Sequence, residues 1–115
     1  MSNNVSYIEN LVKLLPQLKP IYDEHLADND TLLPHVFMGA VARFVIVEVE
    51  KHKRPEVLER ILGCLEEGLE NGAEEVKELI AASFVENLMG ETVALEQMKP
   101  LMGENLRKQV NIICG

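Results

Sequence analysis

Aromatic residues are scarce in this sequence of 115 residues, which contains three phenylalanines, two tyrosines and no tryptophan. Proteins that hold single-stranded nucleic acid stack the bases on aromatic rings, and this chain offers few of them. Positive charge is also in deficit, because the net charge is −8 at pH 7. Such a charge opposes contact with phosphate backbones and with anionic lipid. We therefore expect no nucleic-acid partner and no membrane partner, and we expect any protein partner to be basic.

Cysteines and long apolar runs are lacking as well. Cys64 and Cys114, the two cysteines, lie far apart and match neither a zinc-ligand spacing nor a disulfide framework. The first residues show no cationic start followed by an apolar run, and the longest apolar stretches are too short to cross a bilayer. We therefore expect a cytoplasmic protein with two reduced thiols.

Motifs for catalysis and for cofactor binding are missing too. Ser83 lies in "AASFVENL", which differs from the Gly-x-Ser-x-Gly turn of serine hydrolases, and no glycine-rich phosphate loop occurs. His25, His35 and His52 have no serine or cysteine at a recognisable family spacing. These gaps favour a protein that is not an enzyme and binds no cofactor, although catalytic groups can also be assembled in space from distant positions.

Apolar residues instead recur at helical spacing along most of the chain. Pro34 and Pro55 each open such a pattern, as proline does at the first position of a helix, and Asn71-Gly72 ends one. The expected helices cover about residues 5–18, 21–28, 35–53, 55–71, 73–88, 91–98 and 104–114. The sequence thus predicts an all-α fold in one domain, residues 1–115. We expect a compact stack of about five to seven short antiparallel helices, with a solenoid-like row of hairpins as one form of it.

The stretch "FVIVEVE", residues 44–50, is ambiguous. Its β-branched residues alternate along the chain, which is typical of a strand. The residues around it, from His35 to about Lys53, are apolar on nearly all sides of a helical projection, which is typical of a buried helix. We favour the helix and keep the strand as the alternative.

A polar corner precedes that stretch, in "HLADNDTLLPH". His25, Asp28, Asp30 and His35 are residue types that divalent metals accept as ligands. The calcium-loop pattern fails, however, because leucines stand where a ligand and a glycine are required. Aspartate and asparagine before a helix that begins with proline are ordinary turn and capping residues. We therefore interpret the corner as a turn that holds no metal.

Arg43 stands on an apolar part of the central helix, one turn from Gly39 and Val47. A guanidinium among apolar residues needs a carboxylate or carbonyl groups. In one interpretation Arg43 forms a structural ion pair with an acid such as Glu86, or extends its side chain to the surface. In the other, His35, Arg43 and Glu86 line a site that binds an anion.

Acidic residues are concentrated between residues 56 and 91, which contain ten of them against Arg60 and Lys77. Six glutamates fall off the apolar stripes near the turn at Asn71: Glu66, Glu67, Glu70, Glu74, Glu75 and Glu78. Charged runs usually face water and only solubilise a protein. Their concentration here lowers stability, because like charges repel each other. A concentrated negative surface is also what attracts a basic protein.

Two segments, "LLPHVFMGAVARF" and "IAASFVENL", resemble a family of small bacterial helical domains of uncharacterised function. The likeness covers most of the chain and depends on Leu33-Pro34-His35, Met38-Gly39, Arg43 and Phe84-Glu86-Asn87. It implies an all-helical domain and assigns no catalytic residue. In size, charge and helical content the chain is also similar to immunity proteins, which neutralise secreted antibacterial toxins.

The leading hypothesis is a non-catalytic immunity protein. It would cover the basic active-site cleft of a toxin, most simply a nuclease, with the six glutamates, because a nuclease must present cations to phosphate. One alternative is a helical adaptor, monomer or weak homodimer, that self-associates through Leu106, Val110 and Ile113 of the last helix. The other is a small domain that binds an anionic ligand near Arg43.

Overall fold

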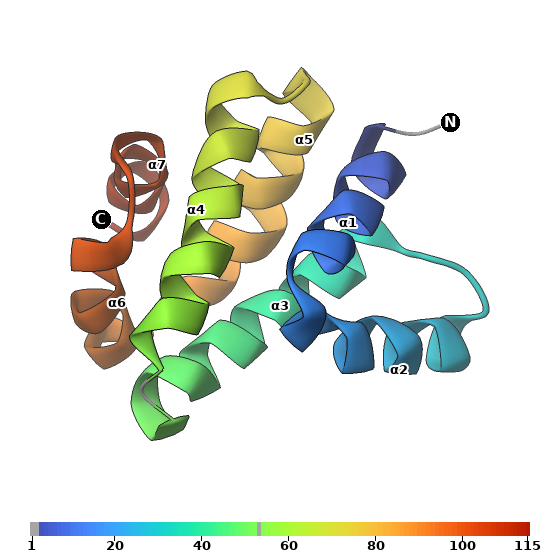
Figure 1. The fold of residues 1–115 in the computed structure, drawn as a ribbon. Helices are drawn as coiled ribbons and strands as arrows, with labels where there is room; N and C mark the ends of the chain where they lie inside the picture. The colour runs from blue at the N-terminus through green and yellow to red at the C-terminus, as the bar shows by residue number, and fades with distance from the viewer. Residues whose placement is uncertain (1–2, 53) are drawn as a thin grey trace.

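The computed structural model describes residues 3–52 and 54–115, and helices follow one another along the whole of this part of the chain (Figure 1). The α-helices are α1 (Asn3–Leu14), α2 (Lys19–Asn29), α3 (Pro34–Val47), α4 (Pro55–Asn71), α5 (Glu74–Leu79), α6 (Thr92–Met98) and α7 (Glu104–Cys114). The shorter helical segments are η1 (Pro16–Leu18), η2 (Glu48–His52), η3 (Ile80–Val85), η4 (Glu86–Leu88) and η5 (Lys99–Leu101). The predicted all-α fold is confirmed. None of the described helices combines the length and apolar character needed to cross a membrane.

Proline and short polar residues set the helix boundaries. Pro34 and Pro55 occupy the first positions of α3 and α4, where the missing N–H would have had no partner within the helix. α2 ends before Asp30, whose backbone is left-handed with φ of 62° and whose N–H donates to the Leu26 carbonyl at 2.9 Å. Aspartate tolerates this conformation better than most residues. The corner between α2 and α3 is therefore closed by the turn chemistry that its sequence predicts.

Residues 44–50, where a strand was the alternative, are helical. α3 runs to Val47 and continues directly through η2, a segment of π-helix. Two adjacent buried pairs, Val41-Ala42 and Glu48-Val49, recur seven residues apart with exposed positions between them. A strand on one face of a core buries every second residue, whereas this spacing corresponds to two turns of helix. The helical period of burial therefore overrides the β-branched composition of the stretch.

A buried carboxylate ties the end of this long helix to the start of the next. Only 1% of the Glu48 side chain is exposed, and Arg54 binds its carboxylate through two N–H groups, with Nε 2.9 Å from Oε2. Hydrogen bonding to Glu48 raises the pKa of Arg54 above its usual value. Such a pair fixes the chain on both sides of the connection between η2 and α4.

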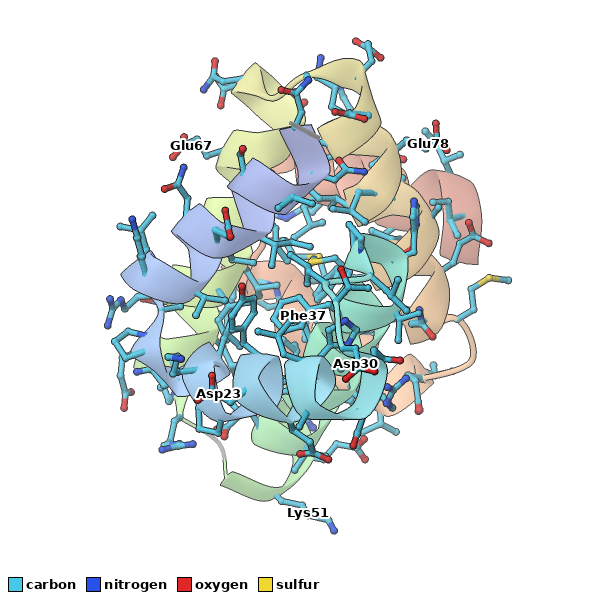
Figure 2. The ribbon with its side chains drawn as sticks, turned by 90° about the vertical axis from the view of Figure 1, so that its right-hand side faces the viewer. Asp23, Asp30, Phe37, Lys51, Glu67 and Glu78 are labelled. Carbon is cyan, nitrogen blue, oxygen red and sulfur yellow. The ribbon has the colours of Figure 1, made fainter. Side chains whose placement is uncertain are left out.

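The helices close around one core. α4 and α5 run antiparallel and meet at the Gly72 turn, with α1 and α2 on one side of them and α6 and α7 on the other (Figure 1). α3 passes obliquely and packs against η3, the continuation of α5. Phe37 of α3 lies at the centre of the molecule (Figure 2) and is completely buried. Phe84 of η3 is completely buried as well. The predicted antiparallel pairing thus holds for α4 and α5, while the oblique helices make a globule in place of a solenoid-like row.

The last helix turns its apolar face inward. Leu106 and Val110 are 0% and 2% exposed, Ile113 is partly buried against the same core, and α7 packs on α4. The prediction of an exposed apolar patch for self-association is therefore wrong, because these residues are buried within the monomer itself. On this helix Ile112 is the large apolar side chain left outside, 75% exposed.

Candidate functional site

Five of the six predicted glutamates lie exposed around the turn between α4 and α5. They are Glu67, Glu70, Glu74, Glu75 and Glu78, which we call the acidic end. The buried residues of the two helices, such as Leu69 and Val76, form inward stripes, so the glutamates between them are left on the outside. Figure 2 shows Glu67 and Glu78 on either side of the same end of the molecule. The hairpin therefore gathers carboxylates from two helices at one end.

Few cations neutralise the acidic end. Lys77 Nζ lies 3.4 Å from Glu74 Oε1, and the backbone N–H of Asn3 donates to Glu75 Oε1 at 2.7 Å. An exposed ion pair of this kind contributes only about 0–1 kcal/mol. Within residues 3–52 and 54–115 no other hydrogen bond or ion pair reaches these five carboxylates. The acidic end therefore keeps its negative field toward solvent.

The sixth glutamate, Glu66, is used inside the protein. Its carboxylate accepts hydrogen bonds from the backbone N–H groups of Asn105 at 3.0 Å and Leu106 at 2.8 Å, and from the Asn105 side-chain amide at 2.8 Å. These backbone groups belong to the first turn of α7, whose N–H groups lack partners within the helix. Gly103 has no side chain, which lets the carboxyl of Glu66 approach the backbone there.

The surroundings of Glu66 also change its acidity. Partial burial alone would raise the pKa of the carboxyl, but the hydrogen bonds from Leu106 and Asn105, together with the charge of Arg107, outweigh it and lower the pKa below 4.5. A carboxylate at a helix N-terminus is further stabilised by the helix dipole. Glu66 therefore caps α7, and the other five glutamates remain exposed.

The second predicted cluster does not assemble. His35 Nδ1 shares a short hydrogen bond with Ser83 Oγ of η3, while Arg43 and Glu86 are both exposed. In the described residues no hydrogen bond or ion pair joins His35, Arg43 and Glu86 to one another. The expected pair between Arg43 and Glu86 is therefore not formed. Arg43 extends to the surface, which is the snorkelling interpretation.

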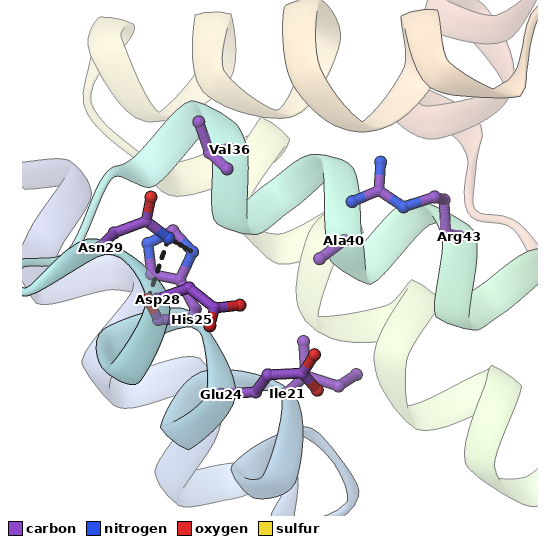
Figure 3. Close-up of a pocket in the computed structure, with 8 residues that line it drawn as sticks. All are labelled: Ile21, Glu24, His25, Asp28, Asn29, Val36, Ala40 and Arg43. Atoms are coloured by element: carbon purple, nitrogen blue, oxygen red, sulfur yellow. Dashed lines mark hydrogen bonds between the residues drawn. The ribbon is translucent and has the colours of Figure 1, made fainter.

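Arg43 instead lines a pocket of about 300 Å³ between α2 and α3, which we call the α2–α3 pocket (Figure 3). Glu24 and Asp28 stand on the α2 wall, and the side chain of Arg43 lies along α3 on the opposite wall. The remaining lining residues are Ile21, His25, Asn29, Val36 and Ala40. This pocket therefore brings two carboxylates and one guanidinium to a common space.

His25, a candidate ligand in the sequence, is a structural residue of the corner. It is 6% exposed, and its Nε2 accepts the backbone N–H of Leu33 at 2.9 Å. Its ring also meets the Phe37 ring edge-on, with centroids 5.8 Å apart. Among the residues that the structure describes, no group of three or more His, Cys, Asp or Glu side chains is arranged to hold a metal ion.

Two contributions to these sites were missed from the sequence. Glu24 and Asp28 are four residues apart, which places them on one face of a helix, so the α2 wall could have been found once α2 was assigned. The sharing of one pocket by α2 and Arg43 could not have been predicted in this way, because it depends on the angle at which α2 meets α3. The pairing of Glu66 with α7 likewise joins residues about 40 apart and leaves no local signal.

These features define a small all-α protein with a carboxylate-rich end and a charged pocket between two helices. The chain belongs to the family described as a domain of unknown function (DUF7674), whose model matches residues 8–113. No curated protein and no solved structure matches the chain. The resemblance to an uncharacterised helical family is thereby confirmed, and the family description says nothing about toxins or immunity.

Proposed function

We propose that this protein is a non-catalytic binding protein of the cytoplasm: an immunity protein that neutralises a basic antibacterial toxin by covering the toxin's substrate cleft with its acidic end. The observation that carries the proposal is the acidic end itself. Five exposed carboxylates from two helices gather at one end of the molecule, and among the residues that the structure describes Lys77 is the cation that pairs with one of them.

Concentrating carboxylates at one end of the protein lowers the stability of the folded state. Like charges on neighbouring helical turns repel each other and destabilise the folded state, so a solubilising role alone would be served better by dispersed charges. A nuclease presents a basic cleft to bind phosphate, and a fixed carboxylate surface matches that cleft in sign. Such a match speeds association and helps to reject partners with other charge patterns.

Charge reversal on the acidic end tests the proposal. The variant Glu70→Lys/Glu74→Lys/Glu78→Lys, called here the reversal variant, changes exposed side chains and leaves the apolar stripes intact. The matched control is Glu50→Lys/Glu59→Lys/Glu96→Lys, which reverses three exposed charges elsewhere. Both variants and the wild type are tagged and used to capture proteins from native lysate at low and at moderate salt.

The proposal predicts that wild type and control retain the same basic protein in near-stoichiometric amount, less of it at the higher salt, and that the reversal variant does not. Circular dichroism establishes that all three proteins are folded. Retention of the same partner by a folded reversal variant, or no basic partner on the wild type, would overturn the proposal.

A further inference from the structure

The α2–α3 pocket has walls of opposite charge. Glu24 and Asp28 are exposed side chains on α2, and Arg43 is an exposed side chain on α3, all lining the same space (Figure 3). Its volume of about 300 Å³ is at the lower end of the range found for pockets that bind small molecules. The pocket lies away from the α4–α5 turn, so it is distinct from the acidic end.

The three charges do not satisfy one another. In the described part of the chain Arg43 forms no ion pair with Glu24 or Asp28, although they share one pocket. Exposed neighbours with the same two signs do pair elsewhere in the protein, for example Lys19 with Asp23 at 2.6 Å. The two carboxylates of α2 and the guanidinium of Arg43 therefore line one pocket without an ion pair between them, and a ligand with two charges of its own can contact both.

The rest of the lining suits a short aliphatic stretch between those two charges. Ile21, Val36 and Ala40 contribute apolar surface from both helices. His25 shapes the pocket but offers a ligand no free ring nitrogen. Its Nε2 already accepts the Leu33 N–H, and its Nδ1 lies 3.3 Å from the amide of Asn29. A pocket lined by carboxylates, a guanidinium and apolar groups is complementary in chemistry to a zwitterion.

We propose that the α2–α3 pocket binds a small amino-carboxylate zwitterion. The ligand's ammonium group lies against Glu24 and Asp28, its carboxylate accepts hydrogen bonds from the Arg43 guanidinium, and its methylene groups contact the apolar lining. This site is independent of the acidic end, so it stands whether or not the protein is an immunity protein.

A series of unbranched ω-amino acids, from glycine to ε-aminocaproate, measures whether both charges are recognised together. Each is titrated into the ¹⁵N-labelled full chain, and binding is read from the amide resonances of α2 and α3. Butylamine and butanoate carry one of the two charges each and serve as probes of single-charge binding. We expect saturable binding that peaks at one chain length and is at least about tenfold tighter than for either single-charge probe.

Two variants test whether the ω-amino acid binds in the α2–α3 pocket. Arg43→Gln and Glu24→Gln each remove one charged wall from an exposed position, and Arg107→Gln removes an exposed arginine on α7 as the control. We expect both pocket variants to weaken binding of the best ω-amino acid about tenfold or more, and the control to bind like wild type. The spectra themselves report that each variant is folded.

The proposal is overturned if no member of the series gives saturable shifts in α2 and α3. It is equally overturned if butylamine or butanoate binds as well as the best zwitterion, or if Arg43→Gln and Glu24→Gln bind like wild type.

Discussion

Replacing Glu66 by glutamine tests the assignment of this residue to the cap of α7. The carboxylate accepts three hydrogen bonds from Asn105 and Leu106, two of them from backbone N–H groups of the first helical turn. Glutamine has nearly the same size but no charge, and its amide nitrogen would face N–H donors. The variant therefore loses the charge-assisted bonds without opening a cavity.

The loss of stability in Glu66→Gln follows from general values for helix caps and for hydrogen bonds to charged groups. Loss of a helix N-cap costs about 0.5–2 kcal/mol, and a hydrogen bond to a charged group contributes about 1.5–3 kcal/mol. Because Glu66 is partly exposed, water replaces some of what is lost, and we expect the free energy of unfolding to fall by about 2 kcal/mol at pH 7. For a chain of 115 residues this lowers Tm by about 8 °C.

The same carboxylate gives the effect a defined pH dependence. In the folded protein the pKa of Glu66 lies below its ordinary value of 4.5, because the hydrogen bonds at α7 outweigh the effect of burial. A group with a lowered folded pKa stabilises the protein above its unfolded pKa, and the stabilisation is lost as the pH falls through the folded pKa. The Tm difference between wild type and Glu66→Gln is therefore expected to be full at pH 7 and to shrink below about pH 4.5.

The adjacent residue supplies the control. Glu67→Gln removes the same charge from an exposed side chain of the acidic end, and we expect it to change the free energy of unfolding by less than about 0.5 kcal/mol. Thermal and urea unfolding, followed by circular dichroism between pH 7 and pH 3, measure both variants. Equal Tm values for Glu66→Gln and Glu67→Gln at pH 7 would refute the capping role.

Two further predictions concern contacts inside the protein, one of packing and one of hydrogen bonding. Gly68→Ala should lower the free energy of unfolding by about 1–3 kcal/mol in urea titrations, because the added Cβ would lie 2.8 Å from the Tyr7 hydroxyl. Gly63→Ala lies in the same helix with no atom within 4 Å of the new Cβ, and it should raise the free energy of unfolding by about 0.5–1 kcal/mol. If Gly63→Ala were instead less stable than Gly68→Ala, the close contact between α1 and α4 at Gly68 would be refuted. His25→Ala should lower the free energy of unfolding by about 1–3 kcal/mol, because it leaves the Leu33 N–H without its acceptor, and unchanged unfolding would rule out this role of the corner.

The helices could be predicted from the sequence because their signals are local. Pro34 and Pro55 begin α3 and α4, and the apolar spacing of each segment marks the side that becomes buried. Residues 44–50 are harder to predict, because their β-branched composition suggests a strand although they are helical. The burial of the adjacent pair Glu48-Val49 follows a helical period, so packing against the core outweighs the local strand preference there.

The sites could be predicted only in part, because they depend on how helices meet. The glutamates of the acidic end follow from their place off the apolar stripes of two consecutive helices. Glu66 shares their spacing but points to α7, and Arg43 pairs with neither His35 nor Glu86 but lines the pocket between α2 and α3. These outcomes depend on the crossing angles of helices far apart in the sequence, which no local pattern encodes.

Inhibition assayed with defined proteins is the most direct test of the claim that the acidic end covers the basic cleft of a toxin. The basic protein retained by the wild type in the capture experiment is purified and assayed for nuclease activity, alone and with an equimolar amount of wild type, reversal variant or control. We predict that wild type and control suppress the activity, that rising salt weakens the suppression, and that the reversal variant does not suppress it. Full suppression by the reversal variant, or none by the wild type, would contradict the claim.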